Sequence, residues 1–332
     1  MRKLGLWIAE WQFQSYHKMR RHPFASFVAL LVASFAVQVK AEVDKDCSVV
    51  RRQAERDHGA YNEPGPSTDQ CEKAHCVRFA TDNNANSSDK RLYDAAKKGD
   101  IPSIKREMAR GASPDVCGPE YQRPLFHATY QRNPLVVREL LRAGADLNVL
   151  DCPGHTPLTI AAFKNDKKIA SLLLLSCAHP EAPGGAITPL TMAAGHGYTD
   201  MLKYLLSQGA NPNTVRANST ALDIAIANQH VEAVEILLTA GANPNFRLTY
   251  GSTPLFHAVG GIRSFLSAED IRSASPFDRA ILKKMLRIVD LLLQHGADVN
   301  LPGLDGETAL HRARLLKEDD IVNALIAAGA TE

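Results

Sequence analysis

The chain has 332 residues, of which 45% are apolar and 6% aromatic, and its formal net charge is +2. The apolar content supports a hydrophobic core, and the low aromatic content suits a core of alanine and leucine better than an aromatic-rich enzyme interior. Residues 1–41 have six cationic side chains against Glu10, so the remaining residues sum to about −3. This balance argues against nucleic-acid binding, which requires a basic face.

The first segment contains an apolar run of 16 residues, Phe24 to Val39, preceded by three cations. Val39-Lys40-Ala41 fits a small-x-small cleavage site, so residues 1–41 are predicted to be a signal peptide. As a helix the run spans about 24 Å, which is short of the roughly 30 Å hydrocarbon core and favours cleavage. An uncleaved membrane anchor through residues 24–39 is the alternative. Met19 would give a more compact signal and is an alternative start of translation.

Residues 42–88 are rich in turn formers and are predicted to be an appended, partly flexible segment. Cys71, His75 and Cys76 are close in sequence, but a zinc site needs four ligands and a second close pair is missing. No metal site is therefore predicted. Disulfide chemistry is the expectation for these cysteines, with Cys47 as a candidate partner.

A repeating unit occupies residues 89–332. The phrase Thr-Pro-Leu or a close variant recurs at intervals of 33, 32, 32, 33 and 55 residues. The copies begin at Arg123, Thr156, Thr188, Thr220, Thr253 and Thr308. In each unit Thr is expected to cap a first helix, Pro to occupy its first turn and Leu to begin the buried stripe. A second apolar helix follows and ends at a left-handed glycine.

The period near 33, with Thr-Pro-Leu and Ala-Ala, closely resembles the ankyrin repeat family. The resemblance implies an all-α solenoid of about seven helix-turn-helix units with β-hairpin-like fingers. Two units depart from the pattern. Cys177 stands where the third unit should have its helix-ending glycine, and the sixth unit has 22 extra residues, roughly Ile262 to Lys283. Pro276 after a capping serine predicts that the second helix of the sixth unit runs from Pro276 to Gln294.

Catalytic signatures are missing from the sequence, including phosphate-binding, nucleophile-elbow and zinc-protease motifs. No catalytic residue and no cofactor is predicted. The rival hypothesis is an enzyme whose site lies in residues 42–88 or in the insert of the sixth unit.

The six cysteines behind an export signal are compatible with an oxidising compartment. Alignment of the units places Cys117 and Cys152 in adjacent fingers, where a disulfide between them is predicted. Unpaired, buried thiols are the alternative. The disulfide candidates are Cys117, Cys152, Cys71, Cys76 and Cys47.

The resemblance implies that the chain binds another protein through a concave face built from finger tips and first helices. The candidate partner-binding residues are Gln122, Tyr130, Gln131, His155, Phe163, Lys164, Ile187, His196, Arg216, Asn228, Thr249, Tyr250 and Glu307. Aromatic and Arg side chains among them are the expected anchors.

The expected function is that of an exported, non-enzymatic protein-binding monomer in the periplasm or outside the cell. It is similar to bacterial exported ankyrin proteins that act as immunity factors against a secreted toxin. A stress-protection partner of an envelope enzyme is a second version of the same role. A membrane-anchored scaffold is the alternative if the apolar segment is uncleaved.

Overall fold

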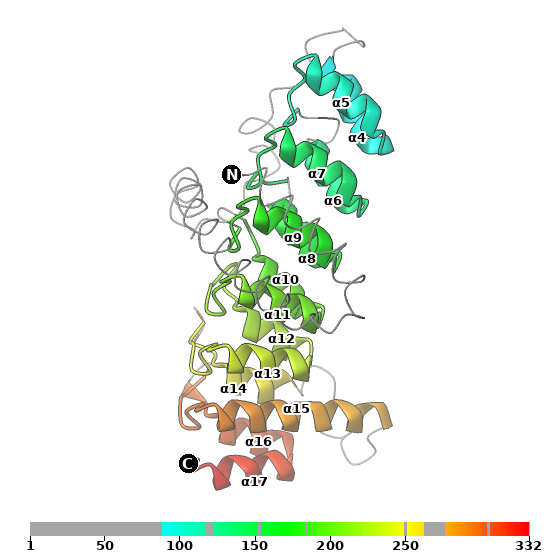
Figure 1. The fold of residues 1–332 in the computed structure, drawn as a ribbon. Helices are drawn as coiled ribbons and strands as arrows, with labels where there is room; N and C mark the ends of the chain where they lie inside the picture. The colour runs from blue at the N-terminus through cyan, green and yellow to red at the C-terminus, as the bar shows by residue number, and fades with distance from the viewer. Residues whose placement is uncertain are drawn as a thin grey trace, which may run out of the picture. The chain divides into compact units, whose positions relative to one another are not determined.

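The computed structural model describes residues 88–116, 118, 123–151, 154–182, 185–248, 251–261, 276–303 and 306–331. Within these ranges the chain forms fourteen α-helices, the seven pairs that the repeats predict, and no strand (Figure 1). The predicted signal peptide and residues 42–87 lie outside the described residues. The chain divides into two compact units, Met1–Pro189 and Leu190–Glu332.

The first unit has three helix pairs in two layers. The first helices of the pairs, α4, α6 and α8, pack in succession, and so do the second helices, α5, α7 and α9. The helices are α4 (Ser88–Lys98), α5 (Ile101–Ala109), α6 (Pro124–Tyr130), α7 (Pro134–Arg142), α8 (Pro157–Phe163) and α9 (Lys167–Leu175). Each pair is an amphipathic turn of the solenoid that buries its faces against its neighbours.

The second unit repeats this arrangement. Helices α12, α14 and α16 form one layer, and α11, α13, α15 and α17 form the other. The helices are α10 (Pro189–Gly195), α11 (Thr199–Ser207), α12 (Ala221–Ala227), α13 (Val231–Thr239), α14 (Pro254–Gly261), α15 (Pro276–Gln294), α16 (Ala309–Leu316) and α17 (Asp319–Ala327). The prediction that α15 extends from Pro276 to Gln294 is confirmed.

The threonines that open the first helices act as caps. Thr156 Oγ1 accepts a hydrogen bond from the Thr159 backbone N–H at 3.2 Å. Thr253 and Thr308 cap α14 and α16 in the same way, each at 3.2 Å. These bonds satisfy one of the four amide groups that a helix N-terminus leaves unpaired. The repeated threonine therefore fixes where these first helices begin, whereas α6 begins after Arg123 without a side-chain cap.

The fingers between pairs are held by asparagine side chains. Four bonds of one kind recur, in which an asparagine Oδ1 accepts from a backbone N–H of the next finger at 2.7 to 2.9 Å. The acceptors are Asn148, Asn213, Asn245 and Asn300. Short antiparallel backbone bonds also close the fingers, as the expectation of β-hairpin-like fingers predicts: the Arg216 and Ser219 N–H groups each donate to the other's carbonyl, and the Asp151 N–H donates to the His155 carbonyl. These closures are too short to form a strand among the described residues, and the asparagine side chains bond further finger amides.

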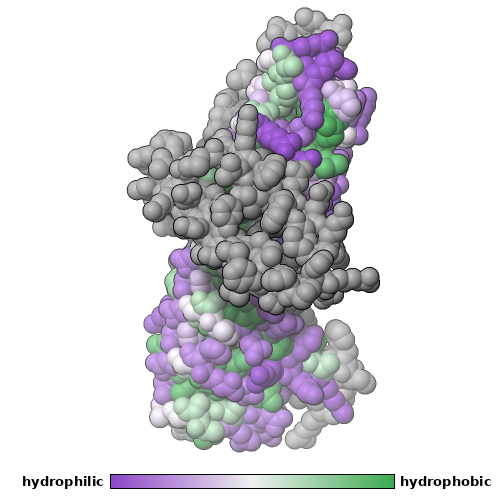
Figure 2. Space-filling view, viewed as in Figure 1, coloured by the Kyte–Doolittle hydropathy of each residue, from purple (hydrophilic) through white to green (hydrophobic). Residues whose placement is uncertain are grey.

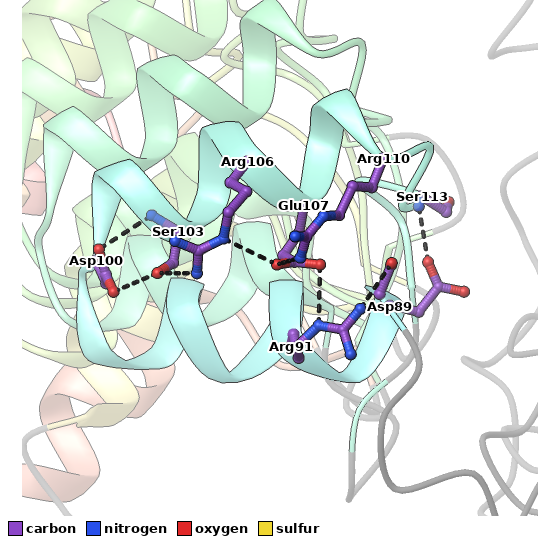
Figure 3. A network of polar contacts seen from close by, with 9 residues as sticks. Asp89, Arg91, Asp100, Ser103, Arg106, Glu107, Arg110 and Ser113 are labelled. Atoms are coloured by element: carbon purple, nitrogen blue, oxygen red, sulfur yellow. Dashed lines mark hydrogen bonds and ion pairs between the residues drawn. The ribbon is translucent and has the colours of Figure 1, made fainter.

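A polar network joins the two helices of the first pair (Figure 3). The Glu107 side chain on α5 has no exposed surface and is surrounded by three guanidinium groups. Their nearest contacts to its carboxylate oxygens measure 3.0 Å from Arg91, 3.3 Å from Arg106 and 2.8 Å from Arg110. A buried carboxylate is tolerated because these partners offset its desolvation. Capping repeats of a solenoid have a polar outer face, and this network of the first pair fits that pattern.

The end of the third pair departs from the common pattern as predicted. Cys177 has a left-handed backbone with a φ of 76°, where the other second helices are followed by glycine. A side chain in this conformation costs on the order of 1 kcal/mol relative to glycine. Ala182, further along the same turn, also has a positive φ of 46°. The turn after α9 is therefore remade locally.

Candidate protein-binding surface

The candidate residues lie at the ends of first helices and in the fingers. In the first unit Tyr130 ends α6 and Phe163 ends α8, and Gln131 and Lys164 are the next residues. His155 and Ile187 precede α8 and α10 in their fingers. Those in the second unit are His196, Arg216, Asn228 and Glu307. Gln122, Thr249 and Tyr250 lie outside the described residues.

Three of the candidates of the first unit form one group, which we call the Tyr130 cluster: Tyr130, Phe163 and Lys164. The Lys164 Nζ lies 5.3 Å from the centroid of the Tyr130 ring and 5.0 Å from that of the Phe163 ring. An ammonium over aromatic faces within about 6 Å is attracted to both rings. Phe163 is 39% exposed. The cluster therefore presents an ordered cation and an apolar ring to the solvent.

Tyr130 is the fixed member of the Tyr130 cluster. Its ring packs against a small core group of Phe126, Val149 and Ile160. Burial raises the pKa of the Tyr130 phenol, and the charge of Asp151 and a hydrogen bond with it raise the pKa further. The phenol is therefore protonated at neutral pH and donates to Asp151. Anchoring at both ends holds the ring in one orientation.

Asp151 links another candidate to the same group. Its side chain is buried and accepts from the His155 backbone N–H at 2.6 Å, with the His155 Nδ1 at 3.3 Å. Sequence reasoning missed Asp151, although an acidic residue just before a finger turn is a suitable acceptor for the amides of that turn. The structure thus brings Tyr130, His155, Phe163 and Lys164 together through direct contacts and through Asp151.

The candidates of the second unit contact residues near their own positions. The His196 ring stacks on Tyr198 with the centroids 5.2 Å apart. Asn228 donates through Nδ2 to the Ile224 carbonyl at 2.9 Å. Glu307 pairs with Arg312 at 3.6 Å. The contacts described for this unit do not gather its candidates into one cluster.

Few large apolar side chains are exposed on the described surface. Figure 2 shows that the coloured residues of the visible face are largely hydrophilic, with hydrophobic patches between them. The large exposed apolar residues are Leu135, Phe163, Leu315 and Ile326. Scattered residues of this kind are normal on a protein surface. Phe163 differs because it belongs to a cluster with a cation and a second aromatic ring.

The sulfur of Cys177 is disulfide-bonded. The sequence did not predict this bond, since Cys177 is not among the disulfide candidates. The five predicted disulfide candidates, Cys117, Cys152, Cys71, Cys76 and Cys47, lie outside the described residues. In the described part of the chain no group of three or more His, Cys, Asp or Glu side chains could hold a metal ion. In that same part, none of the helices has the length and apolar character needed to cross a bilayer.

Models of known protein families match most of the chain. A model described as ankyrin repeats (3 copies) matches residues 92–184, 175–248 and 190–269, and one described as ankyrin repeats (many copies) matches residues 277–314. The chain belongs to the ankyrin repeat family. Ankyrin repeat proteins are in general non-enzymatic modules for protein–protein interaction, and nothing in the described residues indicates catalysis.

Solved ankyrin structures resemble the chain over most of its length. The ankyrin repeat domain of Bcl-3, a member of the IkappaB family, aligns with a TM-score of 0.60 and 26% identity over 71% of this chain and 97% of that one. The human ASB11 ankyrin repeat domain aligns with a TM-score of 0.54 and 22% identity over 73% and 98%. The ankyrin repeat protein EF0377 aligns with a TM-score of 0.51 and 28% identity over 61% and 96%.

A curated relative matches a shorter stretch. The nuclear factor NF-kappa-B p105 subunit of Gallus gallus is 48% identical over 54 residues. The match covers 16% of this chain and 6% of that protein. The likeness is thus one of ankyrin repeats and does not extend to the whole relative.

Proposed function

We propose that this chain is an exported, non-enzymatic ankyrin protein that binds a protein partner in the periplasm or outside the cell. The Tyr130 cluster carries the proposal. It combines an exposed aromatic ring, a cation and a tyrosine anchored by Asp151 at the ends of two neighbouring first helices. Aromatic residues held near the centre of an interface supply much of the binding energy of protein complexes.

The rigidity of the cluster supports a binding role. Tyr130 is restrained by its core contacts and by Asp151, and Lys164 is drawn over both rings. Ordering a long side chain on association costs about 0.5–1.5 kcal/mol. Because the cluster is ordered before a partner arrives, much of that cost is avoided. A partner with an apolar side chain flanked by a carboxylate would complement Phe163 and Lys164.

The biological role proposed for this binding is protection within the cell envelope. The chain would cover the active site of a secreted toxin as an immunity factor, or shield an envelope enzyme under stress. The resemblance to bacterial exported ankyrin proteins supports both versions. Purified candidate enzymes encoded beside this gene provide the test, because an immunity factor would inhibit the enzyme and a protective partner would preserve its activity.

A pull-down from the native envelope tests the binding surface. The double variant Tyr130→Ala/Phe163→Ala should recover at least about tenfold less partner, since each lost anchor is worth about 1–2 kcal/mol. The matched control is Leu135→Ala/Leu315→Ala, which removes two apolar side chains that are 52% and 57% exposed outside the candidate set. Circular dichroism should show the same helix content in both. Equal recovery by the two variants would remove the cluster from the binding surface.

Export is tested separately by N-terminal sequencing of the protein from its native host. Cleavage after Ala41 predicts a mature chain that begins at Glu42 in the periplasmic or secreted fraction. A membrane-bound chain that retains Phe24 to Val39 would instead support the anchored scaffold. Neither outcome affects the expected behaviour of the Tyr130 cluster.

A further inference from the structure

The end of α9 differs from the corresponding place in every other helix pair. The other six second helices are followed by a left-handed glycine, and a Cβ built on any of these glycines meets no atom within 4 Å. The six are Gly111, Gly144, Gly209, Gly241, Gly296 and Gly329. The repeat therefore leaves open space beside this position.

At Cys177 the corresponding space is filled. Its side chain is disulfide-bonded and the residue is only 6% exposed. Ser176 is equally buried, and its Oγ has no hydrogen-bond partner. His179 is 7% exposed, whereas Asp146 and Asn211 at the same place in their units are exposed. Something beyond the repeat pattern covers this end of the third pair.

The backbone at Ala178 and His179 follows the common pattern, and the turn departs from it only further along, at Ala182. The Ala178 N–H donates to the Leu173 carbonyl at 2.9 Å, as Ala145 donates to Leu140 at 3.1 Å. The His179 N–H donates to Asn148 as in the other asparagine contacts between fingers. Within the turn the Glu181 N–H donates to His179 Nδ1 at 3.1 Å, but no cysteine is present there, so the sulfur bonded to Cys177 comes from elsewhere in the chain.

The finger contacts indicate which cysteine can reach Cys177. Asn148 lies beside His179, and the Gly154 carbonyl accepts from the Ala186 N–H at 3.1 Å. Cys152 is two residues from Gly154 in the sequence and four from Asn148, so it is nearer to the contact with Ala186 than to the one with His179 beside the end of α9. A disulfide requires Cα atoms about 4.4–6.8 Å apart. Cys152 is therefore unsuited to Cys177.

Cys117 is unsuited for a related reason. The Asp115 carboxylate accepts from the Asp146 N–H at 3.0 Å, so the finger that holds Cys117 lies against the finger that follows α7. A full repeat separates that finger from the one that follows α9. Cys177 is the one cysteine among the described residues, so the remaining partners are Cys47, Cys71 and Cys76.

We propose that residues 42–87 of the same chain cover the end of α9 and are bonded to it through a disulfide between Cys177 and Cys47, Cys71 or Cys76. In its formation two thiols lose two protons and two electrons and form one S–S bond. The electrons reduce a small-molecule disulfide such as oxidised glutathione to two thiols. A disulfide persists in an oxidising compartment outside the cytosol. The biological relevance of this bond therefore rests on the proposed export of the protein.

The tether leaves the Tyr130 cluster accessible. Helices α8 and α9 form one antiparallel pair, in which Phe163 ends α8 while Cys177 follows the end of α9. The two residues therefore lie at opposite ends of the pair. Loss of the tether should expose Ser176 and His179 without changing partner capture.

Peptide mapping without reduction tests the tether. Trypsin cleaves between all six cysteines and releases Cys177 in the peptide Ile169–Lys203. The full chain, purified with reduced thiols, is oxidised in a glutathione buffer, its free thiols are blocked, and the digest is analysed by mass spectrometry. We expect Ile169–Lys203 joined to a peptide that holds Cys47, Cys71 or Cys76. A link to Cys117 or Cys152, or a blocked free thiol at Cys177, would overturn the proposal.

Two variants complete the test. Cys177→Gly restores the glycine of the other units, so it should fold, lose the linked peptide and show faster hydrogen exchange at residues 176–182. Cys117→Ser/Cys152→Ser is the matched control and should retain the link. Unchanged exchange in Cys177→Gly would mean that residues 42–87 do not cover α9. Oxidation in the test tube is independent of export, so failure of the export proposal is detected separately.

Discussion

The Glu107 carboxylate on α5 accepts a hydrogen bond from Arg91 Nε on α4 at 3.0 Å, and this contact is the centre of the polar network of the first pair. Burial would raise the Glu107 pKa, but the bonds from Arg91 and Arg106 and the charge of Arg110 outweigh it and hold the pKa below its ordinary value. The folded state therefore gains stability from ionised Glu107.

Acid should weaken the first pair through Glu107. Because its folded pKa is depressed, its contribution is present above the ordinary range of a glutamate pKa and is lost as the pH falls through the folded value. Glu107→Gln should lower the melting temperature at neutral pH and reduce the loss of stability on acidification, measured by circular dichroism. The control Glu235→Gln, on the exposed face of α13, should behave as the parent. Parallel acid profiles for Glu107→Gln and the parent would contradict the assignment.

Alkaline pH should weaken the second unit through Tyr204. Burial raises the pKa of Tyr204 on α11 to about 12. A group with a raised folded pKa contributes stability that is complete below its unfolded pKa, about 10, and is lost as the pH rises through the folded value. Urea unfolding between about pH 10 and pH 12 should show a smaller decline for Tyr204→Phe than for the parent. Equal declines would show that Tyr204 ionises freely in the folded protein.

The left-handed backbone at Cys177 predicts an unusual preference for glycine over alanine. Both Cys177→Gly and Cys177→Ala remove the sulfur, so their difference isolates the Cβ atom at a φ of 76°. Cys177→Gly should be more stable by about 1 kcal/mol in denaturant unfolding under reducing conditions. Gly209→Ala, at the equivalent place in the second unit, should lose a similar amount. A more stable alanine at position 177 would refute the strain.

The caps of α12 and α16 should differ in strength. Thr220 forms a capping box with Asp223, whose Oδ2 accepts from the Thr220 hydroxyl at 2.6 Å and from its N–H at 3.1 Å. Thr220→Ala removes the cap and a partner of a buried carboxylate, and should cost about 2 kcal/mol. Thr308→Ala removes a cap alone and should cost about 1 kcal/mol. Thermal unfolding measures both, and equal losses would show that Asp223 adds nothing to its cap.

Local chemistry explains why so much of the fold was predictable. The threonines, prolines and glycines determine the beginnings and ends of helices within a few residues of their own positions. The pattern therefore predicted the helix pairs and the start of α15 at Pro276. The same reasoning predicted a left-handed Cys177. The hairpin-like fingers were predicted as well, but their side-chain bonds, such as that from the Asn213 N–H to Asn211 Oδ1 at 3.0 Å, were not, because such bonds leave no strand pattern in the sequence.

The binding surface was predictable only in part. The sequence placed Tyr130, Phe163 and Lys164 on one face because helix ends recur at a fixed period. Their mutual contact depends on the conformation of the flexible Lys164 side chain, which lies near both rings. The role of Asp151 depends on the fold of the finger, which brings the His155 N–H to its carboxylate. The disulfide of Cys177 was missed because the repeat pattern assigns glycine to that position and indicates no partner for a sulfur there.

The bond from the Asp298 N–H to Asn245 Oδ1 measures 2.7 Å and joins residues 53 positions apart, whereas its counterparts join residues 30 or 31 apart. The extra residues of the sixth unit are therefore accommodated between the helices of a pair, and the spacing of successive fingers is unchanged. Loop closure becomes only slowly more costly with length. That junction can consequently gain, lose or exchange sequence during evolution, and it is a natural place to graft a foreign peptide.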